Sequence, residues 1–162
     1  MSQFSEMVQR HFGFLGKHGY KVEVKSDQRI QYLSSNALIE LFCSDRGEVD
    51  LTLDQNPPKH RFQLRLFLMA FHPDEEKRLG ECIASNPTEV DLALSKLSSI
   101  LTRCGMPLIQ GDPKLFEHMA TVKWWELPGY AMERKPETTM TPKKAVDVAK
   151  PEGTSDNQKT LL

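Results

Sequence analysis

Four carboxylates on two neighbouring predicted strands are the first residues whose chemistry deserves consideration. Glu48, Asp50 and Asp54 share one face of the alternating segment 48–54, and Glu40 lies on the strand before it. Paired carboxylates can bind a hard metal ion or transfer protons, but both uses require a concave, partly dry site. An open pleated face is neither concave nor dry. The default interpretation is therefore a solvated sheet face, and the functional alternative is an acidic surface that docks a basic partner.

Histidine and cysteine form no recognisable catalytic or metal-binding motif. The 5 histidines lack the paired short spacings with cysteine that zinc sites use. Cys82 and Cys104 fall on apolar stripes, where a thiol behaves as a small hydrophobe rather than as a nucleophile. The 3 cysteines, which include Cys43, cannot all pair, so we expect reduced thiols and a reducing compartment. No glycine-rich phosphate loop is present, and we predict no catalytic residue, no metal ligand and no cofactor.

Both tryptophans and a tyrosine lie close together in the sequence, at the end of the predicted folded body: Trp124, Trp125 and Tyr130. Adjacent residues of a helix point about 100° apart, so one tryptophan can pack inward while the other stays near the surface. Closure of the core is the default interpretation. An exposed tryptophan with Tyr130 would instead anchor a partner, because large aromatic side chains dominate interface hot spots.

Composition narrows the class of protein. A chain of 162 residues suits one domain with a substantial core. Lys plus Arg is 21 and Asp plus Glu is 22, so the net charge of −1 supplies no general field for nucleic acid or an anionic membrane. No apolar run approaches the roughly 20 residues that cross a bilayer, and the first 19 residues carry no apolar signal core. We expect a cytoplasmic protein that binds neither nucleic acid nor membrane, and the oligomeric state stays open.

The elements that position these residues begin with a helix over residues 1–18, which Gly19 ends. Four strands follow at about 20–25, 29–33, 37–43 and 48–54, with a tight turn at Asp45-Arg46-Gly47. Val49, Leu51 and Leu53 alternate with the carboxylates and face the core. The pattern predicts an antiparallel meander.

The second half of the chain is predicted to be mainly helical. The sequence of segment 62–71 fits both a fifth strand and a buried helix, and the apolar run at its end favours the helix. A helix begins near Pro73. Asn86-Pro87-Thr88-Glu89 has the order of a capping box and starts another helix that stops at Gly105. Gly111-Asp112-Pro113 starts a further one. We assign residues 1–131 to a single α+β domain and residues 132–162 to a disordered C-terminal tail.

The predicted fold is α+β: an antiparallel meander of four or five strands packed against an N-terminal helix and two or three C-terminal helices. Segments such as Gly19-Tyr20, Tyr32-Leu33-Ser34-Ser35, Asp45-Arg46-Gly47 and Leu108-Ile109-Gln110-Gly111-Asp112 resemble a loose class of small bacterial α+β proteins of unknown function. Some members of that class are regarded as immunity proteins encoded beside toxins. The resemblance implies the fold and assigns no catalytic residue.

Three functions follow as hypotheses. The leading one is a non-enzymatic cytoplasmic protein-binding module, of the immunity type, that occludes a toxin or another basic partner through Glu40, Glu48, Asp50 and Asp54 or through Trp124, Trp125 and Tyr130. The second is a small enzyme with an unrecognised polar pocket. The third is a phage or host structural adaptor, which would self-associate.

Overall fold

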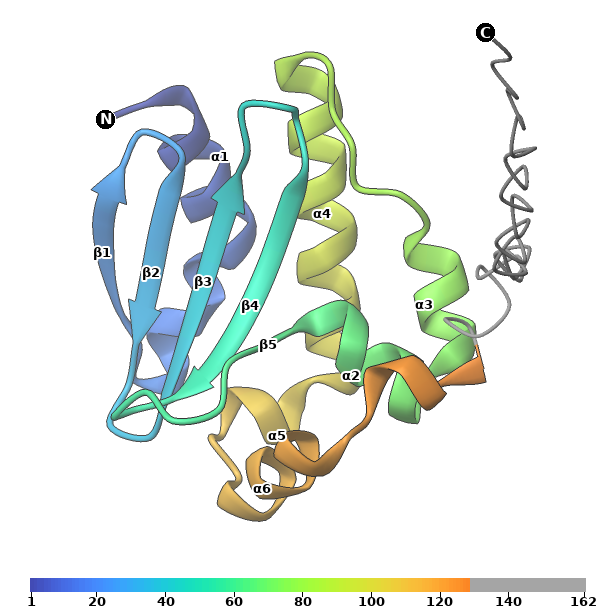
Figure 1. Ribbon diagram of the computed structural model, residues 1–162. Coiled ribbons are helices and arrows are strands. Elements are labelled where there is room, and N and C mark those ends of the chain that lie inside the picture. Colours follow the sequence, from blue (N-terminus) through green and yellow to red (C-terminus); the bar gives the residue numbers. More distant parts are fainter. Residues whose placement is uncertain (129–162) are drawn as a thin grey trace, which may run out of the picture.

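The fold is one antiparallel sheet with helices packed behind it and around one end (Figure 1). A computed structural model describes residues 1–128, so Tyr130, the boundary predicted at residue 131 and the predicted tail lie outside the described residues. The α+β class predicted from the sequence is confirmed. In chain order the elements are α1 (Gln3–Phe12), η1 (Gly13–His18), β1 (Lys21–Ser26), β2 (Arg29–Leu33), β3 (Ala37–Cys43), β4 (Val49–Gln55), β5 (Phe62–Gln63), α2 (Leu64–Phe71), α3 (Pro73–Leu79), α4 (Pro87–Cys104), α5 (Met106–Ile109), α6 (Pro113–Thr121) and η2 (Trp124–Glu126).

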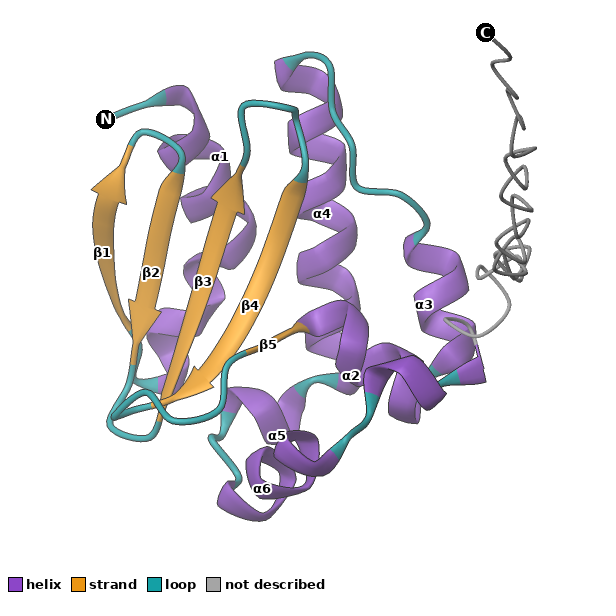
Figure 2. Cartoon of the chain, in the orientation of Figure 1, coloured by secondary structure: helices purple, strands orange, loops and turns teal. Residues whose placement is uncertain are grey.

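The five strands follow one another in the sheet in chain order, as a meander does. Side chains of even-numbered residues on β2 and odd-numbered residues on β3 and β4 form the inner face, where Ile30, Ile39, Leu41, Leu51 and Leu53 are fully buried. Helices α1 and α4 lie behind this face and pack against each other (Figure 2). The aliphatic side of the alternating segment is therefore the core, as predicted.

The N-terminal helix is correctly placed but changes type before it ends. The Ser2 side chain caps α1 by accepting a hydrogen bond from the Ser5 N–H at 3.2 Å. After Phe12 the chain tightens into the 3₁₀ turn η1, and Gly19 ends it with a φ of 83°. Buried Phe12 and Leu15 keep both parts against the core.

Segment 62–71 contains both of the structures that its sequence left open. Phe62 and Gln63 pair with Leu53 and Thr52 as the short strand β5, and α2 begins at the next residue. Buried Leu64, Phe67 and Leu68 then follow a helical period. The apolar run at the end of the segment therefore forms a helix, as its composition favoured.

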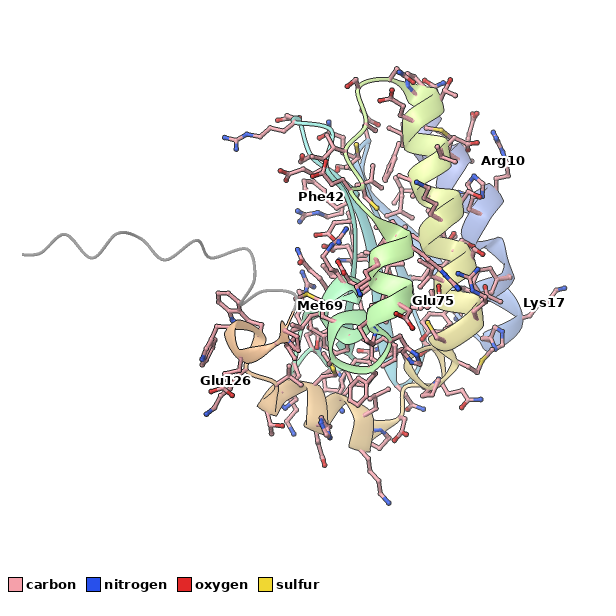
Figure 3. All side chains as sticks on the ribbon, turned by 90° about the vertical axis from the view of Figure 1, so that its right-hand side faces the viewer. Arg10, Lys17, Phe42, Met69, Glu75 and Glu126 are labelled. Carbon is pink, nitrogen blue, oxygen red and sulfur yellow. The ribbon has the colours of Figure 1, made fainter. Side chains whose placement is uncertain are left out.

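Helices α4 and α6 begin where their capping residues predict, and α4 ends at the predicted glycine. The Asn86 side chain accepts a hydrogen bond from the Glu89 N–H at 3.0 Å, and Gly105 follows the last residue of α4. The Glu89 carboxylate accepts a hydrogen bond from the Ser85 N–H, one residue earlier than a capping box requires. Glu75 of α3 accepts a hydrogen bond from Arg103 of α4 at 2.6 Å, which ties the two helices together (Figure 3).

The two margins of the sheet differ. Beyond β4 the chain is paired again, by β5 and by an isolated bridge between Glu48 and Ile83. The Val49 N–H donates to the Cys82 carbonyl and the Ala84 N–H donates to the Gly47 carbonyl, both at 2.8 Å. At the opposite margin β1 is exposed along its whole length. Within residues 1–128, no helix is both long and apolar enough to cross a membrane.

Candidate partner-binding site

A row of polar side chains crosses the outer face of the sheet, turned away from α4. The register places Gln31, Glu40, Thr52 and Gln63 opposite one another on four successive strands. Phe42 lies on the same face (Figure 3). The guanidinium carbon of Arg29 is 5.0 Å from the centre of its ring. The polar face predicted for these strands is present, but two of its carboxylates are buried.

Glu40 is 5% exposed, so the solvated position expected for it is wrong. Its carboxylate accepts a hydrogen bond from the Gln31 side-chain amide and lies 3.5 Å from Arg61 Nη1 and 3.9 Å from Arg29 Nε. The two arginine side chains are about half exposed and cover it. A buried carboxylate that is already paired with cations holds the face together and is not accessible to a partner.

Asp54 is 3% exposed, so the expectation of a solvated side chain is wrong here as well. Asp54 Oδ1 accepts hydrogen bonds from the backbone N–H groups of Gln55, Lys59 and His60 at 2.8, 2.8 and 2.9 Å. Arg61 Nε lies 3.6 Å from Asp54 Oδ2. Loop 56–61 therefore folds back over the sheet and uses Asp54 as its anchor.

Glu48 and Asp50 behave differently, because they border a pocket. It has a volume of about 280 Å³ and lies between the start of β4, the start of α2 and the segment that follows α3. Its apolar wall consists of Val49, Leu64, Leu79, Ile83 and Leu97. Its polar side chains are Glu48, Asp50, Gln63, Arg65, Glu81 and Cys82.

The geometry inside the pocket sets Asp50 apart from its neighbours. Asp50 is half-buried and accepts a hydrogen bond from the Gln63 side-chain amide at 2.5 Å and one from the Leu51 N–H at 3.1 Å. Burial raises the pKa of Asp50 above its ordinary value, and the Glu48 carboxylate raises this pKa further. The Leu51 N–H, the Arg65 guanidinium and the Gln63 amide act in the opposite direction.

Arg65 does not neutralise the pocket by itself. Its Nη1 lies 2.5 Å from Glu76 Oε1, and its Nη2 donates to the Gly80 carbonyl. This cation is therefore already paired with a carboxylate of α3. Lys96 of α4 is the other nearby cation, since its charge lowers the pKa of Cys82. Glu48, Asp50 and Glu81 leave the pocket with a negative balance, which favours a cationic ligand.

The sulfur and imidazole groups do not form a nucleophilic site in this arrangement. Burial raises the pKa of the Cys43, Cys82 and Cys104 thiols above the ordinary thiol value, which disfavours the nucleophilic thiolate form. His11 Nε2 lies 2.8 Å from Asp91 Oδ1 and joins α1 to α4. Among residues 1–128, no group of three or more His, Cys, Asp or Glu side chains is placed to hold a metal ion.

The two tryptophans lie away from this pocket, on η2 beyond α6. Both are exposed, so the default expectation that one of them closes the core is wrong. Their rings meet edge to face with centres 5.5 Å apart, because the short 3₁₀ turn places them side by side at the surface. Tyr130, the third aromatic residue of the predicted anchor, lies outside the described residues.

Sequence reasoning found Glu48 and Asp50 but missed Arg65, Glu81 and Cys82. Cys82 was predicted to lie on the apolar stripe of the helix that begins near Pro73, but α3 ends at Leu79, so this prediction is wrong. Arg65 lies on a segment whose sequence fits both a strand and a helix. The weak signal available was the apolar run Cys82-Ile83-Ala84, which ends two residues before the N-cap residue Asn86. Comparison with family models, curated proteins and solved structures found no match for this chain.

Proposed function

We propose that this protein is a non-enzymatic protein-binding module of the cytoplasm, and that the pocket at the start of β4 receives a lysine or arginine side chain of its partner. The observation that carries the proposal is the position of half-buried Asp50 between the exposed carboxylates of Glu48 and Glu81 and an apolar wall. A long aliphatic stem with a cationic tip matches both surfaces, because such side chains bury their methylenes and keep the charge at a polar rim.

The size of the pocket favours a side chain over a cofactor. Its volume of about 280 Å³ lies at or below the lower end of the roughly 300–1,000 Å³ range of small-molecule sites. Ile83 stands at the rim and is 58% exposed, which offers an apolar contact to the backbone around the inserted residue.

The sequence resembles a loose class of small bacterial α+β proteins of unknown function, and some members of that class are regarded as immunity proteins. An immunity-type role, in which the module binds a basic surface of a toxin and occludes it, fits this resemblance. This version needs no chemistry from the module itself. It requires accessible carboxylates in a shaped site, and Glu48 and Glu81 meet that requirement where buried Glu40 and Asp54 do not.

A titration followed by NMR tests the pocket directly. The full chain is titrated with N-acetyl-lysine amide and N-acetyl-arginine amide, and N-acetyl-norleucine amide serves as an uncharged probe of similar shape. We expect the amide signals of Glu81, Cys82 and Ile83 to shift with the cationic probes. Equal shifts with norleucine, or no shifts at the pocket, would refute the proposed cation site.

A cross-linking experiment tests the partner. A photo-cross-linking amino acid at exposed Ile83 should capture a protein through a lysine- or arginine-bearing surface. Reversal of the rim charges with Glu48→Lys and Glu81→Lys should abolish that capture. Glu117→Lys on α6, exposed and outside the pocket, is the matched control and should leave it unchanged. Capture that survives the rim reversals would contradict the proposal.

A further inference from the structure

The sheet has one open margin, at strand β1, and this margin is separate from the pocket at the start of β4. Strand β1 has β2 on one side and no strand of the described chain on the other (Figure 1). The opposite margin is closed by β5 and by the bridge between Glu48 and Ile83. Sheets usually protect such margins, because an unpaired strand offers a row of free N–H and C=O groups.

The hydrogen-bond pattern shows which residues of β1 offer these groups. Antiparallel ladders alternate, so successive residues direct their backbone groups to opposite sides. The Cys43 N–H donates to the Gln28 carbonyl and the Ser34 N–H to the Ala37 carbonyl, so even-numbered residues of β2 bond to β3. Odd-numbered residues of β2 then bond to β1, where they face Lys21 and Glu23. Val22 and Val24 therefore direct their N–H and C=O groups to the open margin.

The side chains of the same two residues are also unprotected. Val22 and Val24 are 44% and 54% exposed, although they lie on the inner face, which is the core face elsewhere in the sheet. On the outer face Lys21, Glu23 and Lys25 alternate in sign, and Lys25 Nζ lies 2.5 Å from Glu23 Oε2 of the same chain, which leaves Lys21 for a neighbour. Free backbone groups, exposed aliphatic side chains and alternating charges together describe a strand that can accept a neighbour.

We propose that two copies of this protein pair through β1, antiparallel and centred on Val22, to form a continuous ten-stranded sheet. This register places Lys21 opposite Glu23 of the second copy, and the two-fold axis repeats the ion pair. Val22 then meets Val22 of the second copy on the inner face, and Val24 meets Tyr20. The Tyr20 N–H is bonded within its own chain to the Leu15 carbonyl, while its carbonyl faces the margin and can accept from Val24 of the second copy.

The other registers are less well matched. Centring on Lys21 would place this ammonium group against Lys21 of the second copy. Centring on Glu23 would place this carboxylate against its own copy and Lys21 against Lys25. Centring on Val24 would place Val22 opposite Ser26, which a register shift turns toward Arg29 of its own chain. All of these registers keep the inner faces of the two copies on the same side, as a shared sheet requires. Charge and hydrogen bonding therefore select the register centred on Val22.

Sedimentation velocity of the full chain over a concentration series tests the proposal. We expect a reversible dimer. Lys21→Glu and Glu23→Lys should each replace two ion pairs by two like-charge pairs and raise the dissociation constant about tenfold. An equimolar mixture of the two variants should restore the wild-type constant, because the glutamate introduced in one chain then faces the lysine introduced in the other.

Lys114→Glu is the control, because Lys114 is exposed on α6, outside the paired strands, and should leave the dissociation constant unchanged. All three positions are exposed, and circular dichroism should show that each variant is folded. A wild-type chain that stays monomeric at every concentration would overturn the proposal. So would a mixture of Lys21→Glu and Glu23→Lys that dimerises no better than either variant alone.

Discussion

Removing the side chain of Asp54 should destabilise the fold far more than its position on a polar sheet face suggests. In Asp54→Ala, the N–H groups of Gln55, Lys59 and His60 lose the single oxygen that accepts all three hydrogen bonds. Arg61 also loses the carboxylate 3.6 Å from its Nε. The change therefore leaves loop 56–61 without its anchor.

The magnitude follows from these contacts. A backbone donor deprived of its partner in a buried setting costs about 1–3 kcal/mol, and three donors that can partly reach water after relaxation cost about 3 kcal/mol in total. Asp54→Asn keeps a carbonyl oxygen at the same position and loses the charge facing half-exposed Arg61, so we expect a loss of only about 1 kcal/mol. A loss of about 3 kcal/mol is a large fraction of the roughly 5–15 kcal/mol that stabilises a typical domain.

Urea unfolding followed by circular dichroism measures both free energies, with exposed Glu48→Ala as a control expected to stay within about 0.5 kcal/mol of the wild type. The ratio of the two Asp54 variants matters more than either value. If Asp54→Asn destabilises as much as Asp54→Ala, the charge and not the three N–H bonds dominates, and the anchoring role is refuted. If Asp54→Ala costs less than about 1 kcal/mol, the loop does not depend on Asp54.

Two further predictions concern backbone strain and pH. Gly47→Ala should destabilise by more than about 2 kcal/mol, because φ is 81° and a Cβ would lie 2.0 Å from the Ala84 carbonyl oxygen; Gly19→Ala, with φ of 83° and open space, should cost only about 1 kcal/mol in the same urea assay. Burial raises the pKa of Asp50 in the folded protein, so its contribution to stability is greatest below the unfolded pKa and is lost as pH rises through the folded value. Asp50→Asn should therefore be more stable than the wild type at about pH 7 and equal to it at about pH 3.5; equal stabilities at neutral pH would contradict this.

The sheet and the helix ends are predictable from the sequence because their signals are local. Alternation over residues 48–54 places Leu51 and Leu53 in the core without information from any other segment. The capping side chain of Asn86 and the glycine at position 105 likewise depend on a few adjacent residues. Segment 62–71 was ambiguous because its apolar run fits a strand and a helix equally. Its first two residues form a strand because they pair with β4, and this pairing is a feature of the tertiary fold.

The candidate site was only half predictable because burial of a charge depends on partners from distant elements. Glu40 and Glu48 look equivalent in the sequence, yet Arg29 and Arg61 converge on Glu40 alone. Asp54 is buried by the loop that follows it in the chain, where the N–H groups of Lys59 and His60 donate to its carboxylate. The hydrophobic periodicity of the sequence does not reveal such a contact. Glu81 enters the site only because residues 82–84 pair with the turn before β4. Such convergence is a property of the tertiary structure.

The sequence correctly predicts strand β1, and the exposure of its apolar side chains fits contact with a second copy of the chain. Its alternation predicts that Val22 and Val24 face an apolar layer, as the same pattern does for Leu51 and Leu53. In β4 the fold supplies that layer, whereas the valines of β1 are half exposed and their backbone groups point away from β2. An apolar face on a strand costs solubility unless something covers it, and β1 keeps two aliphatic residues where a protected margin would carry charge on both faces. Pairing through β1 would place Val22 and Tyr20 of a second copy beside these valines on the inner face, so that β1 would have a strand on each side, as β2, β3 and β4 do.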